Sequence, residues 1–390
     1  ASVILYMIDS NLTVNKSLKI SKEEILKDYY LINESRNLSL IGRKEVFMGR
    51  AKFGVFGDGK ELPQIAMSKF FKNGDFRSGC YRDQTFMMAI EQLNASQFFA
   101  QLYAHSDINF DPHSGGRQMN CHFATRMLND KGEWKTQTDM KNSASDISCV
   151  SGQMPRIVGL GYASKLYREN QNLSNMPNFS IKGNEVIFGT IGDASTSEGH
   201  FWESINACGV LQIPVIMSIW DDGYGISVPS EYHTTRNDLS KALSGFQRSS
   251  NKENGFELFT VKAWDYVGLL DAYSKAEKLA RNEHVPSIIH VKDVTQPQGH
   301  TTSGSHERYK SKERLQWEED YCCIKKMREW IIENNLSNNK ELDEIEKQKV
   351  VEIKEYQSKI DLLEKNMKMR VSLAMEPRWL LQLQQPVYLK

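Results

Sequence analysis

The middle of the chain alternates continuous apolar runs with amphipathic stretches. Four apolar runs have the length of buried strands, at residues 185–191, 214–220, 258–264 and 286–293. Helix-length amphipathic segments follow the first and third runs, at residues 195–211 and 267–282. Strands that are apolar on both faces and separated by helices are typical of parallel sheets. The pattern therefore predicts an α/β fold, with a doubly wound parallel sheet and helices on both of its faces.

Helical patterns also occur on both sides of this central region. Ser21-Lys22-Glu23-Glu24 has the form of a capping box and predicts a helix running to about Asn37. A further helix is expected at residues 153–169, and charged helical segments at residues 312–368 with a break at 336–340. The pattern predicts three parts. They are an N-terminal helical extension (1–45), a ligand-binding α/β domain (46–335), and a C-terminal helical segment and tail (336–390).

Charge and cysteine content narrow the classes of protein to which the chain can belong. Lys and Arg total 49, as do Asp and Glu, so the net charge is zero and no basic footprint for nucleic acid is expected. No apolar run reaches the roughly 20 residues that span a bilayer, and the first residues lack the basic segment of a secretory signal. The six scattered cysteines form no C-x-x-C pair. We therefore expect a cytoplasmic protein with reduced thiols and with no nucleic-acid or membrane partner.

Acidic residues follow two successive predicted strands. Gly192-Asp193-Ala194 ends the first apolar run, and Asp221-Asp222-Gly223-Tyr224 ends the second. Because parallel strands end at the same edge of a sheet, Asp193 and Asp222 are expected to lie close together where ligands bind. A helix beginning at Ser195 would offer its first N–H groups to an anion.

Two carboxylates beside an anion site favour a magnesium–diphosphate group, because Mg²⁺ binds few carboxylates and fills its coordination with phosphate oxygens and water. The glycine-rich signatures of dinucleotide and nucleoside triphosphate sites are absent. A structural interpretation stays open at this point, since Asp193 alone could cap a helix and Asp221-Asp222-Gly223 alone could form a turn.

These segments resemble those of a known family. The stretch from Gly192 to Ser227 is similar to the motif of thiamine diphosphate enzymes, in the form found in the alpha subunit of 2-oxo acid dehydrogenases. Other segments resemble the same family in the same order: Tyr81-Arg82, Gly116-Arg117-Gln118-Met119 with His122, Ser148 to Pro155, and Gly299 to Ser303. The resemblance covers roughly residues 40–335 and implies the thiamine diphosphate-binding fold.

The resemblance implies a role for each matched residue. The metal, Mg²⁺, would be held by Asp193, Asp222 and the carbonyl of Tyr224. The thiamine diphosphate would be held by Tyr81, Arg82, Gly192, Ala194 and Ser195 at its diphosphate end, and by Ser148 and Val150 at its aminopyrimidine. His300 would contact the cofactor near the reacting carbon and act as the catalytic residue, since histidine titrates in the range that proton transfer needs.

Three positions depart from the family pattern. Asp222 stands where the family usually has Asn, which adds negative charge beside a diphosphate. Trp220 occupies a position that is often polar or basic in relatives, and Ala194 replaces the second glycine of the motif.

The resemblance also implies partners. A beta-type subunit would carry the pyrimidine-side domain and the glutamate that activates the cofactor, and a lipoyl-bearing acyltransferase would accept the acyl group from a small 2-oxo acid. The expected activity is oxidative decarboxylation of a 2-oxo acid, with the branched-chain (2-oxoisovalerate-like) type favoured over pyruvate. Two alternatives stay open: another thiamine diphosphate enzyme, transketolase-like or acetoin-cleaving, and a non-catalytic regulatory subunit with a decayed site.

Overall fold

A six-stranded parallel sheet forms the centre of the chain, in a computed structural model that describes residues 11–15, 18–173, 175–250, 253–302 and 304–374. The strands lie in the order β4-β3-β5-β6-β10-β9, and all five pairings between neighbours are parallel. Their bounds are β3 Phe76–Ser78, β4 Asn142–Ser143, β5 Ile187–Gly192, β6 Val215–Trp220, β9 Glu257–Lys262 and β10 Ser287–Lys292. The four strands predicted from apolar runs are confirmed as β5, β6, β9 and β10.

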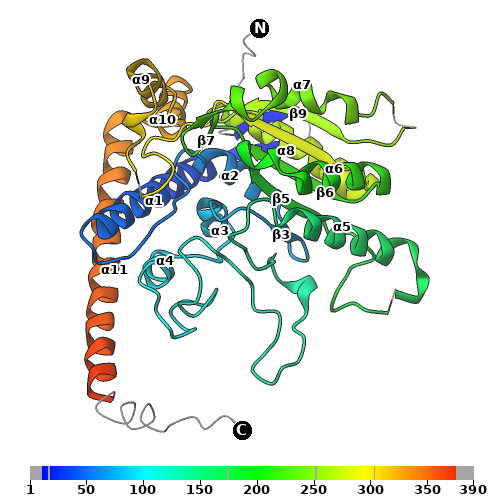
Figure 1. Ribbon diagram of the computed structural model, residues 1–390. Coiled ribbons are helices and arrows are strands. Elements are labelled where there is room, and N and C mark those ends of the chain that lie inside the picture. Colours follow the sequence, from blue (N-terminus) through cyan, green and yellow to red (C-terminus); the bar gives the residue numbers. More distant parts are fainter. Residues whose placement is uncertain (1–10, 16–17, 174, 251–252, 303, 375–390) are drawn as a thin grey trace, which may run out of the picture.

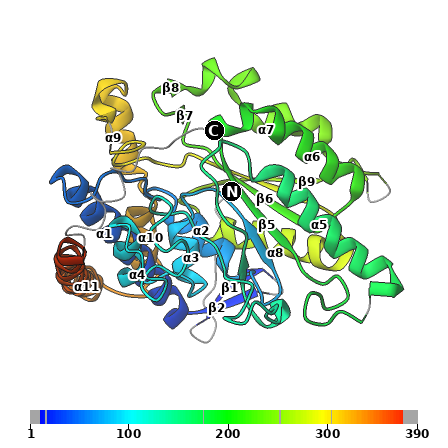
Figure 2. The same ribbon diagram turned by 60° about the horizontal axis from the view of Figure 1, so that its bottom comes forward.

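Helices cover both faces of this sheet (Figure 2). On one face lie α5 (Met154–Glu169), α6 (Gly199–Leu211) and α7 (Leu239–Leu243), and on the other lie α2 (Glu61–Ser68), α3 (Gln84–Ala89) and α8 (Tyr266–Lys278). The helices belong to two separate apolar clusters, one on each face. The predicted doubly wound α/β fold is confirmed.

Strand β6 shows how the sequence builds the two clusters. Val215, Met217 and Ile219 belong to the cluster under α5 and α6. Ile216 and Trp220 belong to the cluster on the opposite face. Successive side chains of a strand point to opposite faces, so β6, which is apolar except for the hydrogen-bonded Ser218, is buried on both sides.

The N-terminal part packs a long helix against the body. An antiparallel pair, β1 (Asn11–Asn15) and β2 (Leu18–Ser21), precedes α1 (Lys22–Phe47). The capping box is confirmed, since the Ser21 hydroxyl accepts a hydrogen bond from the amide of Glu24 and the Glu24 carboxylate accepts one from the amide of Ser21. The helix continues ten residues beyond the predicted end at Asn37. The buried positions of this extension include the polar Ser39, Arg43 and Glu45, so its apolar pattern is weak in the sequence.

Three helices follow the sheet: α9 (Lys312–Asp320), α10 (Cys323–Glu333) and α11 (Asn339–Ala374). The break near residue 336 is confirmed, whereas the break between α9 and α10 was not predicted. Helix α11 runs along α1 and α4 (Ala95–Leu102), and its C-terminal end extends past the body of the molecule (Figure 1). Most of the predicted tail, residues 375–390, lies outside the described residues. Among the helices that the structure describes, none combines the length and apolarity needed to cross a membrane.

Short elements complete the chain. The hairpin of β7 (Tyr224–Gly225) and β8 (Val228–Pro229) follows β6, and a π-helical turn, η7 (Leu279–Glu283), extends α8. The 3-10 turns are η1 Gln137–Asp139, η2 Gln171–Leu173, η3 Ala194–Ser197, η4 Ser230–Tyr232, η5 Thr235–Asn237, η6 Ser244–Phe246 and η8 His306–Arg308.

The predicted start of the helix after β5 was wrong. Residues 194–197 form the 3-10 turn η3, Glu198 has extended backbone, and the α-helix begins only at Gly199. The Thr196 hydroxyl donates a hydrogen bond of 2.5 Å to the Asp193 carbonyl, which holds the tighter turn. An anion at this edge would therefore meet a 3-10 turn rather than the first turn of an α-helix.

Candidate cofactor site

The two predicted acidic segments meet at the carboxyl edge of the sheet. Gly192 at the end of β5 pairs in register with Trp220 at the end of β6, and the Asp193 amide donates to the Trp220 carbonyl at 3.1 Å. The Asp193 carboxylate makes no capping hydrogen bond to η3, and its Oδ2 atom is buried without a partner. Capping therefore does not account for Asp193.

A cavity of about 290 Å³ opens at this edge. Ten of the eleven residues assigned from the resemblance line it: Tyr81, Arg82, Val150, Gly192, Asp193, Ala194, Ser195, Asp222, Tyr224 and His300. The eleventh, Ser148, is not among the lining residues, and its hydroxyl instead lies 3.0 Å from Nε2 of His122. The His122 ring stacks on the ring of Tyr81, with centroids 5.4 Å apart, so Ser148 reaches the cavity wall through two intermediates.

Three carboxylates crowd the strand ends. Burial, reinforced by the charges of Asp222 and Asp221, raises the pKa of Asp193 well above its ordinary value. Burial acts in the same direction on Asp221, but the hydrogen bond and charge of His290, 2.7 Å away, bring the pKa of Asp221 below its ordinary value. Asp193 therefore lacks the compensation that its neighbour has, and a bound cation would provide it.

The Asp222 carboxylate is held in place by three donors. Its Oδ2 accepts from Nζ of Lys60 at 3.2 Å and from Nε2 of Gln296 at 3.3 Å. Its Oδ1 accepts from the Tyr224 amide at 3.2 Å, and Gly223 between them has φ +76. Asp222 thus takes part in the turn that the structural interpretation proposed, while also lining the cavity.

Arg82 and His300 also line the cavity. The Arg82 guanidinium donates to the Phe56 carbonyl at 2.8 Å and lies 3.0 Å from Nε2 of His300. Nδ1 of His300 is buried without a partner. Burial, followed by the charges of Arg82 and Lys60, lowers the pKa of His300 to about 3. The imidazole is therefore neutral at neutral pH, contrary to the ordinary titration range that the sequence suggested.

The segment that carries His300 is fastened to helix α1. The Arg43 guanidinium donates to the carbonyls of Gly299 at 3.2 Å and Thr301 at 3.3 Å, and it forms a 2.7 Å ion pair with Asp58. Backbone carbonyls held by a buried arginine fix the position of the segment.

Trp220 does not take the role of the polar or basic residue that relatives often have at this position. Its side chain is fully buried, and the indole N–H donates to Asp83 at 3.3 Å. Asp83 in turn accepts from Arg77 at 2.8 Å, and Arg77 is also paired with Asp146. Trp220 thus lines the cavity with a neutral indole that is bonded to a buried ion network and offers no charge to a ligand.

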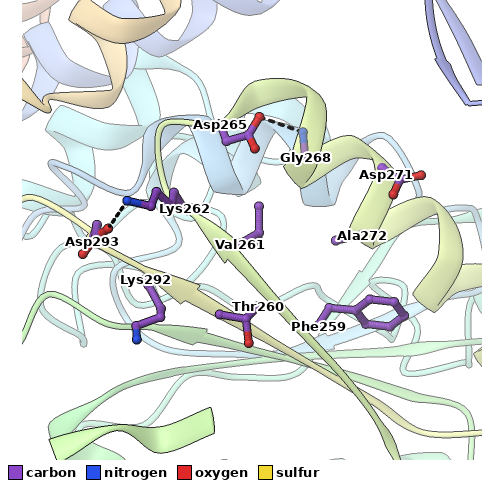
Figure 3. A pocket seen from close by; sticks show the side chains of 10 residues that line it. All are labelled: Phe259, Thr260, Val261, Lys262, Asp265, Gly268, Asp271, Ala272, Lys292 and Asp293. Atoms are coloured by element: carbon purple, nitrogen blue, oxygen red, sulfur yellow. Dashed lines mark hydrogen bonds and ion pairs between the residues drawn. The ribbon is translucent and has the colours of Figure 1, made fainter. Parts of the chain in front are cut away.

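A second, larger groove of about 640 Å³ lies at the outer edge of the sheet, between β9 and α8 (Figure 3). Its charged groups are already satisfied. Lys262 pairs with Asp293 at 3.2 Å, and the Asp265 side chain accepts from the Gly268 amide at 2.9 Å, which caps α8 (Figure 3). None of the predicted site residues lines this groove, so the chemistry is concentrated in the smaller cavity.

The donor set of the smaller cavity fits a metal–diphosphate group. Within the described ranges, no three His, Cys, Asp or Glu side chains stand together as a complete metal site. A metal held by Asp193 and Asp222 would therefore need oxygens from the Tyr224 carbonyl and from the ligand itself, as Mg²⁺ commonly has. The lining cations Arg82 and Lys60 suit an anionic ligand. A Cβ atom at Gly192 would meet only Ser195 Oγ at 3.8 Å, so Gly192 leaves open space here.

Comparison with known proteins identifies the family. The sequence profile described as "Dehydrogenase E1 component" matches residues 35–366, which is most of the chain. The chain belongs to the dehydrogenase E1 component family. In this E1 chain the match includes every residue that lines the smaller cavity.

Three relatives illustrate how far the likeness extends. This E1 chain is 23% identical over 315 residues to the human mitochondrial 2-oxoisovalerate dehydrogenase subunit alpha, covering 80% of this chain and 61% of the relative. It is 25% identical over 242 residues to the 2-oxoisovalerate dehydrogenase subunit alpha of Bacillus subtilis, covering 62% of each. It is 27% identical over 204 residues to the pyruvate dehydrogenase E1 component subunit alpha of Rickettsia bellii, covering 52% of this chain and 55% of the relative. The match to the human relative spans about three fifths of that protein's length.

Sequence reasoning missed Lys60, which immediately precedes α2 and is only 3% exposed. It stands in a polar, glycine-containing loop and belongs to no motif that the sequence analysis identified. A buried lysine becomes recognisable only when its partner, Asp222, is located in space.

Proposed function

We propose that this chain is the alpha-type subunit of a 2-oxo acid dehydrogenase and takes part in oxidative decarboxylation of a 2-oxo acid. The observation that carries the proposal is the cavity at the ends of β5 and β6, which is lined by Arg82, by His300 and by Asp193, whose Oδ2 has no partner. Family membership supports the same assignment, since dehydrogenase E1 components generally depend on thiamine diphosphate. The 2-oxo acid is of the 2-oxoisovalerate or pyruvate type, as in the names of the relatives.

The cavity would hold thiamine diphosphate through Mg²⁺. Asp193, Asp222 and the Tyr224 carbonyl would bind the metal, and Tyr81, Arg82 and the Ala194–Ser195 turn would bind the diphosphate. When bound, the cofactor supplies the nucleophile and the electron sink that decarboxylation needs. Val150 would contact the aminopyrimidine, whereas Ser148 would act on it only through His122.

The residues of the chain position the reactants and handle protons. Arg82 orients an anionic group with its planar fork of donors. His300 is neutral beside Arg82, so its unpaired Nδ1 is available to exchange a hydrogen bond with a ligand. A bound anion would offset the positive charges of Arg82 and Lys60. The pKa of His300 would then rise towards the range in which the imidazole can carry a proton.

The surface around the cavity supports a partner chain. Val150 and Ile226 line the cavity yet are 48% and 60% exposed. Val228 in β8 and Tyr232 in the following turn η4 are further exposed apolar side chains in the segment after β7. Such a surface at the mouth of a site is typical of a protein interface. We propose that a beta-type subunit covers it and supplies the activating glutamate, and that a lipoyl-bearing acyltransferase accepts the acyl group.

Co-expression with a candidate beta-type chain tests the proposal. The purified complex is assayed with a panel of 2-oxo acids, Mg²⁺, thiamine diphosphate and a lipoyl-domain acceptor, with Asp193→Ala as the matched control. We expect turnover by the complex, none by either chain alone, and none by the variant. Activity independent of the lipoyl acceptor would instead indicate a transketolase-like or acetoin-cleaving enzyme. Cofactor binding without turnover on any acid would indicate the non-catalytic subunit.

A further inference from the structure

The carboxylates at the strand ends are balanced unevenly by the protein. Asp221 is bonded to His290, and Asp222 is ion-paired with Lys60 at 3.2 Å, whereas Oδ2 of Asp193 has no partner. Lys60 and Asp222 come from opposite parts of the chain, the loop before α2 and the end of β6, and both side chains are buried. The Lys60 ammonium therefore reduces the net negative charge of the cavity by one.

Asp222 adds a charge that an anionic ligand must tolerate. Asn at this position, as the family usually has, provides an oxygen ligand without a charge, whereas Asp adds one negative charge to the wall that would face a diphosphate. Trp220 lines the cavity but adds no positive charge, because its indole is neutral. Lys60 lies on that wall and contributes the compensating charge.

We propose, on the basis of the function proposed above, that Lys60 is a positioning residue for the metal–diphosphate group. Its ammonium, together with Gln296, fixes the Asp222 carboxylate and cancels its charge, so that Asp193 and Asp222 share one divalent cation without repelling the anion it carries. Lys60 and Asp222 thus act as a charge-neutral substitute for a single Asn.

Removing the Lys60 charge should change the affinity for a cation and the affinity for an anion in opposite directions. Loss of the Lys60 charge leaves an uncompensated carboxylate, which attracts a bare divalent cation more strongly and repels a diphosphate. A merely structural lysine would instead weaken both ligands together when removed.

A double-mutant cycle on the full chain measures these signs. The variants are Lys60→Gln, Asp222→Asn and their combination, with Lys347→Gln on an exposed position of α11 as the matched control. Binding of Mn²⁺ alone is followed by electron paramagnetic resonance, and binding of thiamine diphosphate with Mg²⁺ by calorimetry.

We expect Lys60→Gln to bind Mn²⁺ about tenfold more tightly and the magnesium-loaded cofactor about tenfold more weakly. The double variant should recover cofactor affinity to within about threefold of the original chain. Lys60→Arg, which keeps the charge, should bind the cofactor better than Lys60→Gln.

Two results would overturn the role of Lys60: changes in the same direction for Mn²⁺ and cofactor, or a cofactor defect that Asp222→Asn does not relieve. The double variant leaves no additional unpaired charge buried, and it remains testable if Lys60→Gln alone does not fold. A chain that binds Mn²⁺ but no thiamine diphosphate would remove the proposed function, and the Mn²⁺ affinities alone would then decide whether Lys60 balances Asp222.

Discussion

Replacing Asp193 by Asn should stabilise the ligand-free chain while weakening its hold on a metal. The native carboxylate is buried, has an unpaired Oδ2 and is repelled by Asp222 and Asp221. The amide has nearly the same shape but carries no charge, and its N–H groups can donate to a neighbouring carboxylate. A group kept for binding at the expense of stability is a common feature of functional sites.

The structure sets the size and the pH dependence of this effect. An unsatisfied buried polar atom costs about 1–3 kcal/mol, so the variant should melt about 1–4 °C higher at pH 8. The folded-state pKa of Asp193 is raised, so the native chain loses stability as pH rises from the ordinary carboxyl pKa through the raised one. The advantage of the amide should therefore be larger at pH 8 than at pH 5, because the native carboxyl keeps its proton to a higher pH than an ordinary aspartate.

Differential scanning calorimetry at the two pH values, paired with Mn²⁺ titration, checks this prediction. Asp193→Ala serves as the control for volume, and it should bind no Mn²⁺ at all. The reasoning would be refuted by an Asn variant that melts below the native chain at pH 8, or by a gain that is equal at both pH values. Unchanged Mn²⁺ affinity would show that Asp193 is not a metal ligand.

Three further predictions concern other parts of the chain. The imidazole of His300 should stay neutral from pH 5 to 8, because burial and Arg82 lower its pKa to about 3. NMR titration should show this pKa rising when pyrophosphate is added. An unchanged pKa would show that His300 does not lie beside the anion site. Ser21→Ala should lose the hydrogen bond from the Glu24 amide to the Ser21 hydroxyl, keep the bond from its own backbone amide to the Glu24 carboxylate, and cost about 1 kcal/mol in urea unfolding, whereas Ser21→Asp should cost little. Gly59→Ala should cost more than about 3 kcal/mol or prevent folding, because Gly59 has φ +88 and a Cβ would lie 1.6 Å from the Thr295 carbonyl oxygen. Gly132→Ala is the control, also at positive φ but in open space, and it should lower the melting temperature much less.

The strands of the sheet could be predicted where their own sequence is an apolar run of strand length. β5, β6 and β10 are largely apolar runs that are buried on both faces, so local sequence is sufficient to find them. β9 was found from the same kind of run, but it lies at the edge of the sheet and is only partly buried. β3 and β4 have three and two residues and are held largely by polar bonds, such as that from Arg77 to Ser143. Segments this short show no periodicity, and their pairing becomes visible only in the folded chain.

The candidate site divides in the same way. Asp193 and Asp222 could be placed together because strand ends in a parallel sheet share one edge. The contribution of Lys60 could not, since it depends on where helix α2 packs against β6. The low pKa of His300 was equally hidden, because it results from burial and from Arg82, more than 200 residues away in sequence.

The bond between Arg43 and the His300 segment gives the outer helices a part in the chemistry. Arg43 belongs to α1, and α1 packs along α11. The position of His300 therefore depends on the helical layer as well as on the sheet. A small tilt of α1 would move the Gly299 and Thr301 carbonyls with it, and the separation between His300 and Arg82 would change. Substitutions along the α1–α11 seam, far from any ligand, should therefore alter the proton affinity of the imidazole before they alter the fold.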